Sequence, residues 1–133
     1  MGSTLLIGSC EPFSGKSALV LGIARHLRSS GTRVLFGKPL ATSLDWDSGR
    51  GDPPSPLIDD DVRFVGETLG LPQQDLIPSL HLLSPQTAQT RLGSGTLAAG
   101  EGLEQLRTNL QQSEARVTLL EAAGNLNEGL LYG

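Results

Sequence analysis

The sequence predicts an α/β domain in which a mainly parallel sheet is flanked by helices. The first 37 residues run from a short apolar segment through a helical pattern to a second apolar segment, and the last part of the chain repeats the order helix then strand. Hydrophobic residues make up 38% of the chain but aromatic residues only 4%, so Leu, Val, Ile and Ala must form the core. With 133 residues, the chain has about the length of one domain.

The opening elements follow directly from the spacing of apolar residues. Residues 4–7 form an apolar run that stops at Gly8, as a buried strand does before a tight loop. Residues 17–30 have helical periodicity, and Gly31 stands where a terminating glycine belongs. Residues 33–36 are the second strand, and a helical crossover of this length predicts that the two strands are parallel neighbours. The predicted apolar face of the helix comprises Leu19, Ile23 and Leu27, widened by Val20 and Ala24.

The middle of the chain alternates between loop and helix. Residues 38–56 hold four of the eight prolines and predict a long loop that could cover a ligand. Residues 59–70 predict a helix, because acids stand at its start and a glycine at its end. Its apolar stripe comprises Val62, Val65 and Leu69. Residues 71–100 are rich in Pro, Ser, Thr, Gln and Gly, with a short strand expected at 80–83.

The last predicted elements are a helix and a strand. Residues 103–115 return to helical spacing, and residues 116–120 form an apolar strand that ends at Glu121. A carboxylate directly after such a strand is expected at the carboxyl edge of the sheet. Ligands of open α/β sheets bind at that edge.

Composition excludes several functional classes. The formal net charge is -4 and the ten basic residues are scattered, so no nucleic-acid partner is expected. No apolar stretch is long enough to cross a bilayer, so no membrane partner is expected. The single cysteine, Cys10, excludes an internal disulfide and a cysteine-based metal site. Cytoplasmic localisation is the resulting expectation.

A candidate phosphate-binding loop lies between the first predicted strand and the first predicted helix. Gly15 lets backbone N–H groups turn toward a phosphate, Lys16 brings charge to the terminal phosphates, and the Ser17 hydroxyl can ligate Mg²⁺. The helix N-terminus adds the positive end of its dipole. The alternative interpretation is a chance tripeptide at a helix start, with Ser17 as its cap. The strict loop pattern has glycine where this chain has Cys10, and the nearest upstream glycine is Gly8, so this loop is longer than the common form.

Four segments together resemble a known family. They are residues 8–17, Gly37-Lys38-Pro39-Leu40-Ala41-Thr42, Asp59-Asp60-Asp61 and Leu120-Glu121-Ala122-Ala123-Gly124-Asn125. In this order they resemble the dethiobiotin synthetase fold, which is P-loop NTPase-like. The resemblance is closer to the related amino-terminal domain of some bacterial phosphate acetyltransferases and of DRTGG-domain proteins, which are AAA family ATPase-like. The segments span nearly the whole chain, and the Lys-Pro and Glu-x-x-Gly pieces are fairly specific together but weak singly.

The resemblance implies a chain that binds ATP together with Mg²⁺. It implies that Lys16 and Lys38 act on the phosphates as catalytic residues and that Thr42 lies toward the substrate. The residues implied to bind the nucleotide are Ser14, Gly15, Lys16, Ser17 and Thr42.

The resemblance also implies Mg²⁺ ligands, namely Ser17, Asp61 and Glu121. Physical chemistry agrees in outline, because Mg²⁺ prefers few carboxylates completed by phosphate and water. Other interpretations of these charges stay open. Lys38 would then be a solvated strand end, and residues 59–61 would serve only the helix dipole.

Two departures from the family bear on activity. Ala122 replaces a glycine of the family, and the phosphate loop is longer than in dethiobiotin synthetase, which argues against carboxylation of a diamine. The leading hypothesis is therefore an ATP-binding domain with a regulatory or ligand-sensing role. The alternatives are a Mg-ATP-dependent ligase similar to dethiobiotin synthetase and a non-catalytic interaction module that keeps the fold. The family fold continues beyond Gly133, so residues 1–133 are expected to be an incomplete domain, either a fragment or a shortened relative. A sheet this short would have an open edge that suits self-association or a partner.

Overall fold

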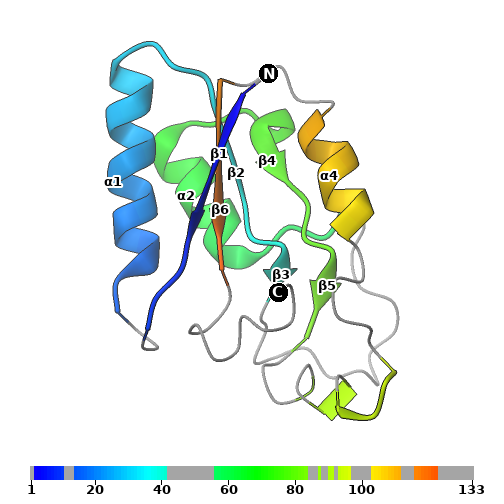
Figure 1. The fold of residues 1–133 in the computed structure, drawn as a ribbon. Helices are drawn as coiled ribbons and strands as arrows, with labels where there is room; N and C mark the ends of the chain where they lie inside the picture. Colours follow the sequence, from blue (N-terminus) through cyan, green and yellow to red (C-terminus); the bar gives the residue numbers. More distant parts are fainter. Residues whose placement is uncertain are drawn as a thin grey trace.

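The computed structural model shows an α/β fold with a parallel sheet flanked by helices, as predicted (Figure 1). It describes residues 2–10, 14–41, 56–83, 87, 90, 91, 93–96, 103–111 and 116–122. The strands are β1 (Ser3–Ile7), β2 (Val34–Gly37), β3 (Leu40–Ala41), β4 (Leu76–Ile77), β5 (His81–Leu82) and β6 (Val117–Glu121). The helices are α1 (Lys16–Ser29), α2 (Asp60–Leu69), α4 (Leu103–Gln111) and the 3₁₀ turn η1 (Gln73–Asp75). Within these ranges, no helix combines the length and the apolar character needed to cross a membrane.

The main sheet has the strand order β1-β6-β2-β4, and all its pairs are parallel. The prediction that the first two strands are neighbours is wrong, because β6 lies between β1 and β2. Four of the five residues of β6 are buried. A strand that is buried on both faces is most stable in the middle of a parallel sheet. Strands β3 and β5 form a separate parallel pair.

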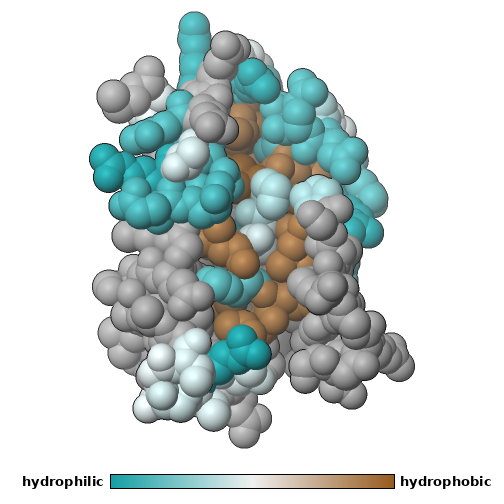
Figure 2. Space-filling model, turned by 90° about the vertical axis from the view of Figure 1, so that its right-hand side faces the viewer, coloured by the Kyte–Doolittle hydropathy of each residue, from teal (hydrophilic) through white to brown (hydrophobic). Residues whose placement is uncertain are grey.

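Helices cover both faces of the sheet. In Figure 1, α1 and α2 lie on one side of the sheet and α4 lies on the other. The core under α1 and α2 comprises Ile7, Val20, Ala24, Val34, Phe36, Val62, Val65 and Leu119. The core on the α4 side comprises Leu35, Ile77, Leu106 and Leu120. Full burial of one such Leu or Phe side chain stabilises the fold by about 1.5–3 kcal/mol. Figure 2 shows the α4 side, where hydrophobic surface runs down the middle of the view.

Helix α1 packs against the core through most of the predicted face, including the partly buried Ile23 and Leu27, with Leu19 as the exception. Val20 and Ala24 are fully buried against the sheet, whereas Leu19, predicted on the same face, is 56% exposed. The rotation of a helix about its axis depends on which side chains fit the sheet, and the smaller Val20 and Ala24 allow a closer approach. The helix ends as predicted, because Gly31 has a φ of 75°. The N–H of Gly31 bonds to the carbonyl of Arg28, and that of Thr32 bonds to Leu27.

Helix α2 begins and ends at the residues that the sequence indicates. The Asp59 side chain accepts a hydrogen bond from the Asp61 N–H, and Gly70 ends the helix with a φ of 59°. Val62 and Val65 are fully buried as predicted. At the other end of the chain, the helix expected over 103–115 is α4, which ends at Gln111. Residues 112–115 lie outside the described ranges.

The segment after α2 holds more structure than the sequence predicts. The short strand expected at 80–83 is β5, but β4 and η1 were not expected. Their anchor is an ion pair in which Arg33 Nη2 lies 2.7 Å from Oδ1 of the buried Asp75. Strand β4 also lies very close to β2, because a Cβ atom added to Gly37 would stand 2.6 Å from the Cβ of Ile77. Only glycine fits at that position of β2.

Candidate functional site

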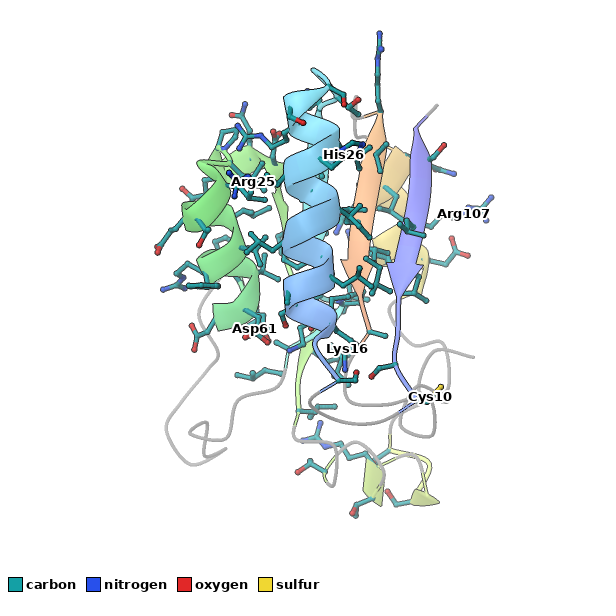
Figure 3. The ribbon with its side chains drawn as sticks, turned by 90° about the vertical axis from the view of Figure 1, so that its left-hand side faces the viewer. Cys10, Lys16, Arg25, His26, Asp61 and Arg107 are labelled. Atoms are coloured by element: carbon teal, nitrogen blue, oxygen red, sulfur yellow. The ribbon has the colours of Figure 1, made fainter. Side chains whose placement is uncertain are left out.

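The predicted site residues that the structure describes converge on the carboxyl edge of the sheet. Ile7 in β1 lies opposite Glu121 in β6, and Gly37 in β2 lies opposite Leu120. Lys38, the residue after β2, is therefore level with Glu121. In Figure 3, Lys16 and Asp61 lie at the same end of the molecule, toward which the arrows of β1 and β6 point.

The N-terminus of α1 has the features of an anion-binding helix start. Gly15 occupies the N-cap with φ 86° and ψ 23°, a left-handed conformation that glycine adopts without strain. The N-cap makes no side-chain hydrogen bond to the helix, and the first turn contains no acidic residue. Ser14, just before it, is exposed. Backbone N–H groups at such a terminus attract negative charge.

The next two residues point their polar atoms in defined directions. Lys16 Nζ donates a hydrogen bond to Ser9 Oγ at 3.0 Å. Ser17 Oγ donates to Glu121 Oε1 at 3.1 Å, which joins the start of α1 to the end of β6. The structure thus brings together Lys16, Ser17 and Glu121 as predicted. Ser9 was not predicted, although its place between strand and loop is the signal that could have found it.

Glu121 carries the most unusual atom of the site. Glu121 is only 3% exposed. Its Oε2 atom is buried and has no hydrogen-bond partner among the described residues. Burial raises the pKa of Glu121, while the charge of Lys38 and the hydrogen bond from Ser17 counteract this only in part. A buried carboxylate oxygen without a partner is costly, so a ligand or cation that reaches it would be bound favourably.

Lys38 is held between two aspartates at the start of α2. Its Nζ lies 2.9 Å from Asp61 Oδ2 and 3.6 Å from Asp59 Oδ2, and the residue is buried. Burial alone would lower the pKa of Lys38, but the hydrogen bond to Asp61 and the nearby carboxylates outweigh burial and raise it. Ser79 Oγ donates to the Lys38 carbonyl at 2.6 Å and so fixes the backbone. In this arrangement the Lys38 ammonium is ion-paired with Asp59 and Asp61. Its contact with phosphate stays a prediction.

The side-chain oxygen atoms of Ser17 and Glu121 suit a hard cation that takes its other ligands from bound phosphate and water. Within the described ranges, no three His, Cys, Asp or Glu side chains form a group that could hold a metal by themselves. Ser17 offers a hydroxyl and Glu121 a carboxylate, and the two groups are joined by a hydrogen bond. Mg²⁺ is commonly bound by one or two protein oxygens together with phosphate and water. Thr42 lies outside the described residues, as does most of the loop predicted at 38–56.

Comparison with known proteins adds no assignment. No model of a protein family matches the chain, and no curated protein matches it. The function must therefore be argued from the residues of the site.

Proposed function

We propose that the chain is an ATP-binding domain that holds the phosphates of Mg-ATP at the N-terminus of α1 and serves a regulatory or ligand-sensing role. The main support is Glu121, a buried carboxylate whose Oε1 accepts a hydrogen bond from Ser17 and whose Oε2 has no partner among the described residues. Such an oxygen beside a helix N-terminus needs a cation if an anionic phosphate is to bind next to it.

Each residue of the site has a specific task under this proposal. Gly15 and the first N–H groups of α1 bind the phosphate oxygens through the backbone. Lys16, which donates a hydrogen bond to the Ser9 hydroxyl, would form a charge-assisted bond to phosphate. Ser17 and Glu121 would hold Mg²⁺, with Asp61 as a further carboxylate. When bound, Mg²⁺ supplies positive charge that neutralises the phosphates.

The state of Lys38 favours binding over phosphoryl transfer. A ligase of the dethiobiotin synthetase type would need this ammonium at the transferred phosphoryl group. Here Lys38 Nζ is held by Asp61 and lies 3.6 Å from Asp59. Its charge is therefore largely neutralised by protein carboxylates. This supports a domain that senses ATP.

Calorimetric titration of Mg-ATP into the wild type and into Lys16→Ala tests the proposal. We expect saturable binding to the wild type and a loss of at least about tenfold in the variant, because a charge-assisted bond to phosphate is removed. Arg28→Ala is the matched control, since it removes a cation from the exposed last turn of the same helix. It should bind Mg-ATP like the wild type.

Two further titrations sharpen the result. Inorganic tripolyphosphate in place of ATP measures how much of the affinity comes from the phosphates alone. Omission of Mg²⁺ should weaken binding in the wild type and have little effect in Glu121→Gln. Equal binding by the wild type and Lys16→Ala, or no binding by either, would remove the proposal.

A further inference from the structure

The two carboxylates around Lys38 differ in how firmly they are held. Asp59 has a side chain that is 3% exposed, whereas the Asp61 side chain is 53% exposed. Asp59 Oδ1 accepts the N–H of Asp61 at 2.8 Å as the N-cap of α2, and its Oδ2 faces Lys38. Asp59 therefore cannot turn away from Lys38 without giving up the helix cap. Asp61 can turn toward solvent or a ligand while the helix stays capped.

Lys38 itself has little freedom to follow Asp61. Its ammonium is buried, with 6% of the side chain exposed, and its carbonyl is fixed by the Ser79 hydroxyl. If Asp61 left, a buried ammonium without a close carboxylate would be strongly unfavourable. Asp59 Oδ2 already forms an ion pair with the ammonium at 3.6 Å, so a small shift of the ammonium only has to shorten this contact.

We propose that Asp59 is a positioning residue, the fixed partner that retains Lys38 while Asp61 is the exchangeable partner that turns to a bound cation. This inference rests on the proposed function for the identity of the cation, Mg²⁺ beside a polyphosphate. The division of tasks between Asp59 and Asp61 is a property of the chain itself. Asp59 acts through Lys38 and Asp61 and does not contact the nucleotide.

The chain offers a direct probe, because Lys16 and Lys38 are its only lysines. Labelling lysine with ¹⁵N at Nζ gives at most two ammonium signals in an NMR spectrum, and Lys16→Ala identifies the one from Lys38. A buried, ion-paired ammonium exchanges its protons slowly with water, so its signal is sharp. A loss of both aspartate contacts speeds up the exchange and broadens the signal.

The first arm needs neither metal nor phosphate. In Asp61→Asn, the Lys38 signal should persist, because Asp59 takes over as the direct partner. Disappearance of the signal in this variant would overturn the proposal, since Asp59 would then be unable to hold Lys38. This arm remains decisive even if the chain binds no nucleotide.

The second arm adds Mg²⁺ and tripolyphosphate. The wild type should keep the Lys38 signal, whereas Asp59→Asn should lose it on addition, because the Asp61 carboxylate turns to the cation and residue 59 no longer offers a charge to Lys38. The Mg²⁺ affinity of Asp59→Asn should fall about tenfold, as is common when a residue behind a metal ligand is changed. Asp60→Asn, which removes an exposed acid from the same helix turn, is the control and should match the wild type in both readouts.

Asn at position 59 retains the helix cap, so folding should be preserved, and Asp59→Ser provides a second capping variant. If Asp59→Asn and Asp59→Ser fold and keep both the signal and the affinity in the presence of Mg²⁺ and tripolyphosphate, the positioning role is contradicted. If Mg²⁺ and tripolyphosphate change no spectrum and bind nowhere, the proposed function fails while the Asp61→Asn arm still decides on Asp59.

Discussion

Ser17 and Glu121 are 104 residues apart in the chain, and a 3.1 Å hydrogen bond joins the hydroxyl of one to the carboxylate of the other. The bond ties the first turn of α1 to the last residue of the central strand β6. The second oxygen of Glu121 is buried and has no hydrogen-bond partner in the part of the chain that the structure describes. The site thus carries a local energetic cost that a ligand can relieve.

Glu121→Gln should change how stability depends on pH. Burial raises the pKa of Glu121 in the folded chain, so between the unfolded value of 4.5 and the folded pKa the folded state binds more protons. Wild-type stability should therefore fall as pH rises through that window. The stability of Glu121→Gln should not fall for this reason, because Gln does not titrate. Denaturant unfolding at several pH values should show a stability difference that moves in favour of Glu121→Gln as pH rises above 4.5. A difference independent of pH would contradict the raised pKa.

Gly37→Ala should destabilise the fold by about 1–3 kcal/mol, because overpacking forces the backbone apart. The added Cβ would stand 2.6 Å from Ile77 Cβ and 3.1 Å from the Ile77 carbonyl oxygen. Gly22→Ala is the matched control, since its Cβ meets nothing within 4 Å and it lies within helix α1. That change should stabilise by about 0.5–1 kcal/mol. Urea unfolding of both variants checks the opposite signs, and a neutral Gly37→Ala would show that β2 and β4 separate easily.

Arg33→Ala should cost about 1–3 kcal/mol, because it leaves a buried carboxylate without its main partner. Arg33 Nε and Nη2 both donate to Asp75 Oδ1, at 3.2 and 2.7 Å. Arg25→Ala, at an exposed position of α1, should change stability by less than about 0.5 kcal/mol. Thermal unfolding compares the two. Equal effects would mean that the ion pair contributes nothing beyond a surface charge.

Leu6→Lys should reduce self-association without lowering stability. Leu6 is 62% exposed on β1, and no described strand pairs with the outer edge of β1. The strand Ser3–Ile7 contains no charged residue, so nothing in it discourages another strand from pairing there. Sedimentation over a range of concentrations should show association that weakens in Leu6→Lys. Identical behaviour of the two proteins would exclude this edge as the contact.

Much of the fold could be predicted from the sequence because local signals were strong. The glycines at 31 and 70 end α1 and α2, and the apolar runs at 4–7 and 116–120 became β1 and β6. The exposure of Leu19 on α1 could not be predicted, because periodicity gives the width of an apolar face but not which edge of it meets the sheet. Strand β4 was missed because two residues show no alternation.

The site divides in the same way. Lys16, Ser17 and Glu121 could be predicted together, because each lies at the end of a helix or strand at the same edge of a parallel sheet. The ion pair of Lys38 with Asp61 could not, because it depends on where α2 packs after a long connection. The sequence indicates Asp59 as part of an acidic helix start. The contact of its Oδ2 with Lys38 depends on the tertiary structure and could not be predicted.

The strand order has a consequence for biosynthesis. Strand β6 lies between β1 and β2 in the sheet, and it is the last of the described strands to be synthesised. On the ribosome, the first two strands cannot complete their backbone hydrogen bonds until residues 117–121 have emerged, and closing so long a loop is slow. Shorter nascent chains should therefore expose apolar strands to chaperones. Because the same strand delivers Glu121, a translation product that stops before it would lack both a closed sheet and the carboxylate on which the site depends.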